Sequence, residues 1–493
     1  MAKQQKRNGT LHAMPRKGID LMTKKLFALA LVVLMIFTLV GCTGDKREIV
    51  KLTLSTEDSE AILAAAGITL PDAETTLASG TTVKYHHWVD AFHNYAEDEI
   101  INTGYWTFAN KYNCEVEWVE TTYGSRFDDL ANLILAGTSP DFTTASVSTF
   151  PEKCLKGVFV PITDYIDYDD PLWAGNKEFV DRYFSMNGER WIICTDVKAT
   201  DVCAYNRRVI EEWGFDDPAE LFANDEWTWD VFYDMCVDFS DPDDDRYALD
   251  GWAWQSALVN STGVTLIAID EEGKFISNID DPALESVQTI IYDLNKNEAR
   301  CPTIMRGTET DGAGIKEGLC LFWLREKWAF TGPVDDMSNI WGDIGAGELM
   351  FVPIPRNPSG DGNYYLGGQP VGYHIVSGAE NPEGVVLLSM CERFKILDPT
   401  VIDIDIKQLK EIYLWTDEML EMNDLCQNLA KANPVVNFSS GCPANLSSSV
   451  NNLVGGTTGN NAQTWAQLKE QYAETIDYYL EELNATVEAF GAN

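Results

Sequence analysis

The stretch Val83-Lys84-Tyr85-His86-His87-Trp88 begins the pattern from which the fold is predicted. Its aromatic and β-branched residues alternate with other side chains, which is typical of a β-strand. A segment with helical spacing follows at residues 95–112, and a second strand is expected at Glu115–Val119. Residues 125–137 have apolar side chains at the spacing of one helix face and end in Gly137, a suitable C-cap. This order of strand, helix, strand and helix predicts an α/β fold with a largely parallel sheet.

The N-terminal region has the features of an export signal. The basic segment Met22–Lys25 precedes an apolar run at residues 26–40. That run is too short for a comfortable membrane span, which takes about 20 residues. The sequence Leu39-Val40-Gly41-Cys42 then resembles the bacterial lipobox, in which the cysteine is lipidated and becomes the mature N-terminus. An uncleaved membrane anchor is the alternative.

We therefore expect Cys42 to carry a lipid anchor. Residues 1–41 are then the leader and signal peptide, and residues 42–80 are a tether between the lipid and the folded part. The sequence leaves open whether translation starts at Met1 or Met22.

Length and charge limit the organisation and the partners of the chain. With 493 residues it is long for one hydrophobic core, so two lobes are expected. The formal net charge of −41 repels phosphate backbones and anionic lipid headgroups. We therefore expect no nucleic-acid partner, and we expect attachment to a membrane only through the lipid.

The cysteines indicate neither a zinc site nor a clear disulfide framework. Ten of the eleven follow Cys42, an even number that could pair in an oxidising compartment, but they are scattered and most sit in apolar runs. The sequence contains no C-x-x-C and only five His, which gives zinc little support. Buried free thiols are the favoured interpretation, with pairing left open.

Short segments resembling one protein family occur in a fixed order along the chain. They are Gly137–Phe142 (Gly-Thr-Ser-Pro-Asp-Phe), Leu155–Ile162, Asn187–Ile193, Ala204–Gly214, Trp227–Asp230, Lys316–Leu321, Val352–Pro355, Gly367–Tyr373 and Asn381–Glu383. Together they resemble family 1 of the extracellular solute-binding proteins of ABC importers, which includes maltose-binding protein. The chain departs from the family pattern at Cys320-Leu321, which replaces Ala-Met, and at Cys194, where Pro is usual.

The resemblance implies a two-lobed, periplasmic-binding-protein-like α/β fold with an interlobe ligand cleft. The chain would cross between the lobes more than once, so that residues 81–198 and 322–376 form the first lobe and residues 199–321 and 377–493 form the second. Open α/β sheets bind ligands beyond the carboxyl ends of their strands, and hinge closure around a ligand is the motion known for this shape.

Tryptophan is the first group of candidate ligand-binding residues. Sugar rings present apolar C–H faces and polar edges, so aromatic platforms beside carboxylates and amides suit a neutral saccharide. The chain has 15 Trp, several of them expected in loops that face the cleft. The candidates are Trp88 and Asp90, which follow the first strand, Trp252 and Trp254, which we expect in a loop, and Trp323 and Trp328, which flank the crossing strand. For any single Trp, a place in the core is an equal alternative.

The resemblance adds polar and backbone candidates near the expected strand ends and crossings. These are Asp141, Ser146, Ser148, Thr200, Asp201, Gly368 and Tyr373. Ser residues in loops are more often simple turn formers, and a Gly-Gly pair is more often a plain turn than a place of close approach to a ligand.

A run of alternating acidic residues is the one candidate metal site. Asp241, Asp243 and Asp245 give a D-x-D-x-D spacing, but Arg246 occupies the sixth position, where a calcium loop requires Gly, and Trp252 occupies the twelfth, where it requires Glu. We favour a solvated acidic turn and expect no metal and no cofactor.

The expected lipid anchor and the family resemblance together predict a lipid-anchored protein on the extracellular face of the cell membrane. It would capture a sugar or oligosaccharide as a monomer, deliver it to an ABC permease and not act as an enzyme. The alternatives are a secreted glycoside hydrolase, which would use two carboxylates about 5–9.5 Å apart, and a sensory or adhesive lipoprotein with the same fold. The sugar, its chain length, the affinity and the permease are left open.

Overall fold

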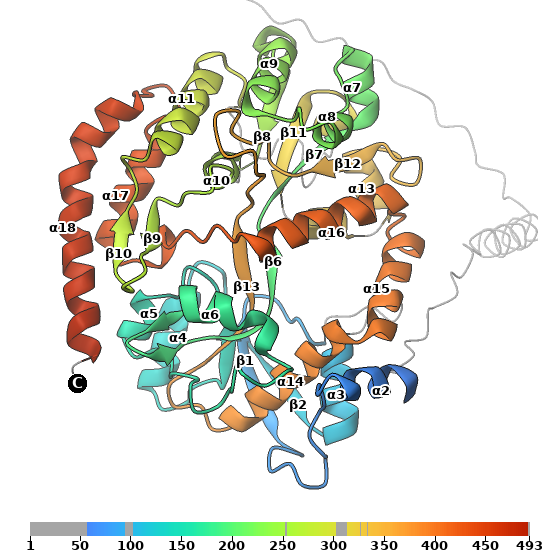
Figure 1. The fold of residues 1–493 in the computed structure, drawn as a ribbon, viewed down its shortest axis with the longest axis vertical. Helices are drawn as coiled ribbons and strands as arrows, with labels where there is room; N and C mark the ends of the chain where they lie inside the picture. Colours follow the sequence, from blue (N-terminus) through green and yellow to red (C-terminus); the bar gives the residue numbers. More distant parts are fainter. Residues whose placement is uncertain are drawn as a thin grey trace, which may run out of the picture. The chain divides into compact units, whose positions relative to one another are not determined.

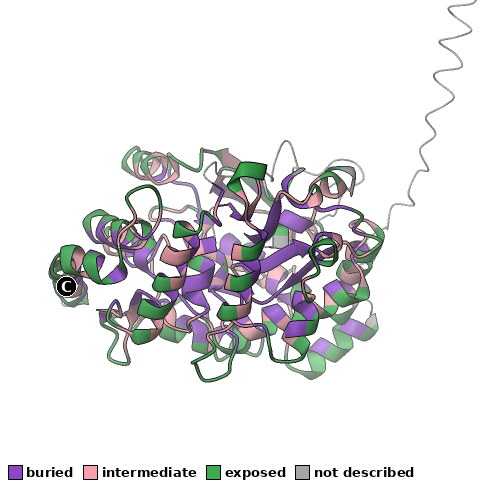
Figure 2. Cartoon of the chain, turned by 90° about the horizontal axis from the view of Figure 1, so that it is seen from above, coloured by how far each residue is buried: buried purple, intermediate pink, exposed green. Residues whose placement is uncertain are grey.

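The computed structural model describes residues 57–93, 102–251, 254–301, 313–325, 327–332 and 334–491. The leader, Cys42 and Trp252 lie outside these ranges. Within them the strands form two main sheets, each covered by helices (Figure 1). Most residues of the strands in the two sheets are buried in the interior, and the helices turn their exposed faces outward (Figure 2).

The first sheet has five strands in the order β2-β1-β3-β13-β6. β1 is parallel to β2 and β3, whereas β13 runs antiparallel to both β3 and β6. The strands are β1 (Thr82–His87), β2 (Glu115–Glu120), β3 (Phe142–Thr144), β6 (Ile193–Ala199) and β13 (Gly368–Ile375). The predicted strands at 83–88 and 115–119 are β1 and β2, which opens the chain with the expected parallel pair.

Helices pack against the first sheet. α14 packs against β1, β6 and α3, and α4 follows β2 as predicted. The elements of this lobe are α2 (Glu57–Ala65), α3 (Thr103–Tyr112), α4 (Arg126–Leu135), α5 (Glu152–Leu155), η1 (Ala174–Asn176), α6 (Lys177–Tyr183), the hairpin β4 (Ser185–Met186) and β5 (Glu189–Arg190), and α14 (Pro382–Leu397). α14 lies in the part predicted for the second lobe, because its apolar side chains are buried against α3 and the first sheet.

The described part of the predicted tether is packed rather than free. Leu63 and Ala78 are buried in the core, and the hydroxyl of Tyr112 donates a hydrogen bond of 2.7 Å to the carbonyl oxygen of Pro71. Residues 57–80 therefore belong to the first lobe, because their apolar side chains find a place against α3.

The second sheet has four strands in the order β12-β7-β11-β8. They are β7 (Val202–Asn206), β8 (Tyr247–Asp250), β11 (Cys320–Arg325) and β12 (Leu349–Val352). We predicted residues 322–376 in the first lobe, and this is wrong for β11 and β12. β11 pairs with β7 and β8, and all its side chains are buried, as expected for a central strand.

Helices and short turns of helix complete the second lobe. They are α7 (Arg207–Trp213), α8 (Pro218–Ala223), α9 (Trp229–Phe239), η2 (Pro242–Asp244), α10 (Trp254–Asn260), α11 (Pro282–Lys296), α12 (Ala313–Lys316), η3 (Lys327–Phe330) and α13 (Val334–Trp341), with the hairpin of β9 (Ile267–Ile269) and β10 (Phe275–Ser277).

The chain passes between the sheets repeatedly. β6 of the first sheet leads into β7 of the second through Thr200 and Asp201 alone, and residues 353–367 return from β12 to β13. α15 (Pro399–Glu411) then leads to α16 (Asp417–Ala432), which packs against both β6 and β12. The predicted two-lobed α/β fold with multiple crossings is confirmed.

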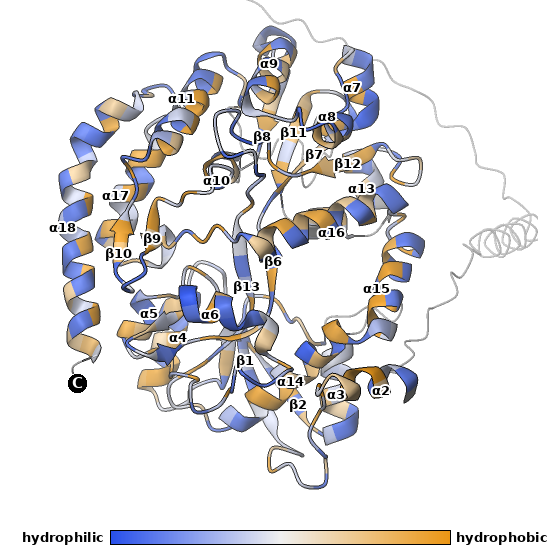
Figure 3. Cartoon of the chain, viewed as in Figure 1, coloured by the Kyte–Doolittle hydropathy of each residue, from blue (hydrophilic) through white to orange (hydrophobic). Residues whose placement is uncertain are grey.

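The C-terminal part also contacts both lobes. It consists of η4 (Ser439–Gly441), α17 (Ala444–Gly455) and α18 (Trp465–Gly491), and α18 alternates hydrophobic and hydrophilic residues along its length (Figure 3). The indole of Trp465 donates to the carbonyl of Ile279 in the second lobe (3.2 Å). Near the other end of α18, the amide of Asn187 in the first lobe donates to the carbonyl of Val487 (2.8 Å).

The ten cysteines after Cys42 are all buried and free, as the sequence favoured. Burial raises the pKa of the Cys154 and Cys203 thiols well above the ordinary value, so these cysteines are neutral core residues. Among the described residues, no helix is both long and apolar enough to cross a membrane.

Candidate functional site

The carboxyl ends of several strands meet where the chain crosses between the sheets. β1, β2, β3 and β6 run in one direction and end at the same edge of the first sheet. In the second sheet, β8 and β11 end beside the start of β7, because Arg325 pairs with Val202. With two residues between β6 and β7, these two edges face each other. Ligands of open α/β sheets bind at such edges.

An exposed aromatic cluster lies at this edge of the first sheet. It consists of Trp88 after β1, Tyr123 after β2 and Phe127 on α4, with Arg126 among them. Trp88 is 37% exposed and Tyr123 63%, and their ring centres lie 5.0 Å apart at a right angle. The guanidinium carbon of Arg126 lies 3.9 Å from the ring centre of Tyr123 and 4.3 Å from that of Phe127. We call this the first-lobe aromatic cluster.

Short polar contacts hold the cluster in place. The Oδ1 atom of Asp90 accepts hydrogen bonds of 3.0 Å from the backbone N–H groups of Phe92 and His93, which fixes the turn after β1. The ring of His87 stacks on Trp88 with centres 3.7 Å apart. Burial, aided by the charge of Arg126, lowers the pKa of His87, so the imidazole is neutral at pH 7. Because its Oδ1 atom accepts these two backbone hydrogen bonds, Asp90 positions the loop instead of presenting a free carboxylate.

The second sheet contributes a stack of two indoles and one guanidinium at its facing edge. The guanidinium carbon of Arg325 lies 4.2 Å from the ring of Trp323 and 4.4 Å from the ring of Trp328. Trp323 is buried and stacks on Trp341, with centres 5.1 Å apart. Trp328 is 51% exposed. This second-lobe stack thus presents one indole to solvent on a rigid support.

Hydroxyl groups occur after β3 and at the crossing between the two sheets. Ser146 and Ser148 follow β3, are half-buried, and have their hydroxyl oxygens 2.7 Å apart. Thr200 lies at the crossing itself, where its buried Oγ1 has no hydrogen-bond partner among the described residues. Asp201, the next residue, is buried.

Three predicted ligand-binding residues are used elsewhere in the fold, and a fourth is buried inside the second-lobe stack. Asp141 is fully buried at the start of β3, where its carboxylate accepts from the N–H groups of Lys84 (2.8 Å) and Asn381 (2.7 Å). Trp254 begins α10 and is buried, although we expected it in a loop. Trp323, which we expected beside the crossing strand, is buried within β11 as part of the second-lobe stack. Gly368 packs against α16 and Pro434, where an added Cβ would lie 2.7 Å from the Cβ of Pro434.

Tyr373 also points away from the facing edges. Its hydroxyl donates a 3.0 Å hydrogen bond to Glu392 on α14, so it lies on the face of the first sheet that α14 covers. The register of β13 places this residue opposite Thr144, and its ring packs edge-on against Phe142.

The acidic run in the second lobe forms a turn. Asp241 caps η2 and, with Asp244, forms ion pairs with Arg246 of 3.2 and 2.9 Å. Asp245 adopts a left-handed backbone conformation. Within the described ranges, no group of three or more His, Cys, Asp or Glu side chains is placed to hold a metal ion.

Sequence reasoning missed several residues at the facing edges. Tyr123, Arg126 and Arg325 were not among the candidates, although each follows or ends a predicted strand. The segment between α16 and α17 was missed too: its Val435 pairs with Gly367 of the second crossing, and the N–H of Phe438 donates to Ile267. A search for aromatic and Arg residues just after each strand finds the first three.

The chain is similar to known proteins in sequence and in fold. The sequence model described as bacterial extracellular solute-binding protein matches residues 87–296, which confirms the predicted resemblance to that family. No curated protein matches the chain.

Solved structures show the same fold at low sequence identity. An ABC substrate-binding protein of Listeria monocytogenes, Lmo0181, in complex with cycloalternan is 15% identical with a TM-score of 0.59, over 81% of this chain and 98% of that one. The galacto-N-biose/lacto-N-biose I-binding protein of Bifidobacterium longum, in complex with lacto-N-biose, is 12% identical with a TM-score of 0.57, over 84% and 98%. The maltotriose-binding protein of Thermus thermophilus with maltotriose is 14% identical with a TM-score of 0.53, over 81% and 99%.

Proposed function

We propose that this protein is an extracellular solute-binding protein that captures a neutral saccharide between its two lobes and delivers it to an ABC permease. The observation that carries the proposal is the pair of exposed indoles, Trp88 and Trp328, at strand ends that face each other across a two-residue crossing. The family match over residues 87–296 supports it independently.

The chemistry of the facing edges suits a sugar. An indole offers an apolar face to the C–H groups of a pyranose ring, and the hydroxyls of Ser146 and Ser148 can exchange hydrogen bonds with its polar rim. The guanidinium of Arg126 lies over the ring of Tyr123, and that of Arg325 lies over the ring of Trp328, so each places positive charge beside an exposed aromatic ring. The bound sugars of the similar structures are of this chemical class.

Closure of the lobes supplies the mechanism. A ligand that touches both edges stabilises the closed arrangement of the lobes. It shifts the balance between open and closed molecules by no more than the difference between its affinities for the two arrangements. The crossing at Thr200–Asp201 and the longer one at 353–367 are the segments that would bend. Binding and release need no covalent step, so we infer that the protein is not an enzyme.

The expected export signal and lipobox indicate where the receptor would act. A lipid on Cys42 would hold it at the extracellular face of the membrane, within reach of a permease. Labelling with a radioactive fatty acid should mark the wild-type chain and not a Cys42→Ala variant.

A thermal-shift screen of mono- and oligosaccharides tests the binding function. A ligand that binds only the folded state raises stability by RT ln(1 + [L]/Kd), which is about 2.7 kcal/mol at one hundred times Kd. We expect at least one neutral saccharide to raise Tm, with no hydrolysis of aryl-glycosides. Turnover of an aryl-glycoside would favour a glycosidase, and a flat response to the whole panel would leave the sensory or adhesive alternative.

A further inference from the structure

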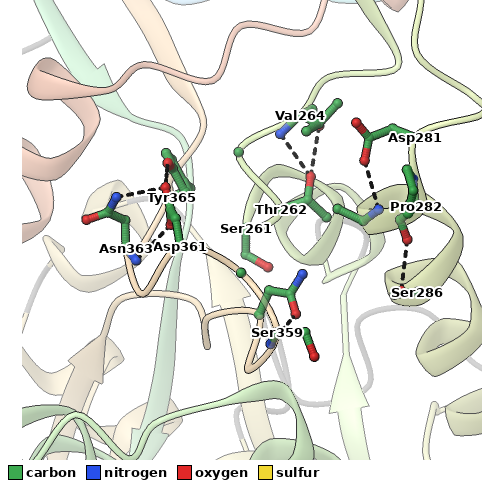
Figure 4. Close-up of a pocket in the computed structure, with 14 residues that line it drawn as sticks. Ser261, Thr262, Val264, Asp281, Pro282, Ser286, Ser359, Asp361, Asn363 and Tyr365 are labelled. Carbon is green, nitrogen blue, oxygen red and sulfur yellow. Dashed lines mark hydrogen bonds between the residues drawn. The ribbon is translucent and has the colours of Figure 1, made fainter.

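A cavity of about 510 Å³ lies in the second lobe, and none of its described lining residues belongs to the first-lobe aromatic cluster or to the second-lobe stack (Figure 4). Its walls are residues 261–264 after α10, residues 281–286 at the start of α11, and residues 357–365 of the segment between β12 and β13. Every described residue that lines it belongs to the second lobe or to that segment, so the cavity is complete without lobe closure. Its volume falls in the range of small-molecule sites, roughly 300–1,000 Å³.

The lining is rich in hydroxyl, amide and carboxylate groups. Figure 4 shows these side chains around the cavity: Thr262, Asp281, Ser286, Ser359, Asp361 and Asn363. None of the described lining residues is Lys, Arg or His. Two carboxylates without a neighbouring cation repel an anionic ligand and accept hydrogen bonds from hydroxyl donors. The charge of the cavity therefore selects neutral, hydroxyl-bearing molecules or cations.

Tyr365 supplies an aromatic wall whose position is fixed from two sides. Its hydroxyl donates a 2.6 Å hydrogen bond to Oδ2 of Asp361. Its ring packs directly on the backbone of Gly263, where an added Cβ would lie 2.9 Å from a ring carbon. Gly263 also has φ +75°, a conformation that residues with side chains rarely adopt. An aromatic wall beside carboxylate and amide groups is the combination that binds the apolar face and polar rim of a sugar.

A cation is the competing occupant, and the contacts of the two carboxylates disfavour it. Asp361 already accepts three hydrogen bonds, from the backbone N–H and the side-chain amide of Asn363 (both 2.9 Å) and from Tyr365. Asp281 caps α11 by accepting from the N–H of Ala283 at 2.8 Å. In the described part of the chain, no three acidic, His or Cys side chains converge on a possible metal position.

We propose that this cavity is a second binding site, which takes a neutral saccharide or sugar alcohol independently of the site between the lobes. It needs only the second lobe and the segment 357–365. That segment continues into Gly367, whose carbonyl accepts a 2.8 Å hydrogen bond from Thr200 N–H at the crossing. A molecule held against Tyr365 therefore contacts the same chain segment that joins the lobes.

Fluorine NMR on the full chain labelled with 3-fluorotyrosine tests the second site directly. The resonance of Tyr365 is the one that a Tyr365→Phe variant lacks. It is followed while maltose, maltotriose, tagatose and ribitol are titrated separately. We expect at least one of them to shift this resonance saturably, and Asp361→Asn to weaken that binding by tenfold or more. Asp270→Asn is the matched control, because Asp270 also accepts backbone hydrogen bonds in an exposed turn of the same lobe but does not line the cavity.

A Trp328→Ala variant separates this site from the one between the lobes. We expect the shift of the Tyr365 resonance to persist in that variant, whether or not any saccharide binds between the lobes. The second site is overturned if no probe shifts the resonance, if CaCl₂ alone shifts it, or if the shift disappears in Trp328→Ala. The proposed function would fail if no saccharide bound in a way that Trp88→Ala or Trp328→Ala weakens.

Discussion

At the scale of single residues, burial decides what the polar side chains near the strand ends do. Arg325 is buried, yet its guanidinium lies between two indoles, and one of them, Trp328, reaches solvent. Such a cation–π contact contributes from about 0.5 to 2 kcal/mol, depending on desolvation. The stack therefore holds Trp328 in one orientation before a ligand arrives, which reduces the entropy lost on binding.

Glu392 shows the cost of burying a carboxyl group. It lies on α14 beneath α3, so close that a Cβ at Gly104 would lie 2.6 Å from its Cα. Burial raises its pKa from the ordinary 4.5 to about 7, although hydrogen bonds from Tyr373 and Asn102 oppose the rise. Between these two pH values the folded protein keeps a proton that the unfolded chain has lost. Stability from this group is therefore present at low pH and is lost as the pH rises through about 7.

A Glu392→Gln variant tests this pH dependence. The amide keeps the shape and stays neutral, so the variant should match the wild type near pH 4 and be more stable at pH 8. The gain is at most about 3 kcal/mol, from the size of the pKa shift. Urea unfolding at several pH values measures it. If the free energy of unfolding changed with pH in the same way for the wild type and for Glu392→Gln between pH 5 and 8, the carboxyl group would not be buried in this way.

At the scale of elements, the segment between α16 and α17 packs against both lobes. Phe438 packs against Phe150 of the first lobe and Phe275 of the second, with ring centres 5.9 and 5.8 Å apart. Gly441 in η4 passes so close to β3's following loop that an added Cβ would overlap the carbonyl oxygens of Val147 and Phe150. Only glycine fits there without a shift of the backbone.

A Gly441→Ala substitution should therefore lower the free energy of unfolding by about 1–3 kcal/mol, the usual cost of overpacking. Gly455→Ala in α17 is its matched control, because a Cβ there meets no atom within 4 Å and alanine favours the helix. Urea unfolding of the two variants gives the comparison. Equal stability of the two variants would mean that η4 is not held against the first lobe.

The positions of several strands and helices along the chain were predictable from the sequence. The sheet to which each strand belongs was not. Local alternation and spacing located β1, β2 and α4 to within a few residues, because these signals arise from neighbours in the sequence. β11 and β12 are buried on both faces, so their sequences are apolar runs that do not indicate which sheet each strand joins. Only pairing with β7, more than 100 residues away, decides where they lie.

The candidate site was predictable by place more than by residue. Trp88 and Trp328, two of the candidates expected near strand ends, are exposed in the structure. Residue type alone could not separate them from Trp254 and Trp323, which are buried, since tryptophan serves cores and binding surfaces equally well. Asp141 illustrates the same limit for carboxylates, because backbone N–H groups take up its oxygens.

At the scale of the whole molecule, two sheets meet through short crossings and are bound together again at the C-terminus. α18 is held by Ile279 in the second lobe and by Asn187 in the first. A ligand that closes the lobes must therefore contact both of them. A saccharide bound to one lobe alone would not change their arrangement.

Isothermal titration calorimetry of the best saccharide from the thermal-shift screen, on the wild type and on Trp88→Ala and Trp328→Ala, tests this claim most directly. Trp213→Ala is the control, because Trp213 is 39% exposed on α7, which begins at the other end of β7. The account predicts that each of the first two variants binds at least tenfold more weakly, a loss of about 1.4 kcal/mol, while Trp213→Ala binds like the wild type. Wild-type affinity in both Trp88→Ala and Trp328→Ala would contradict it.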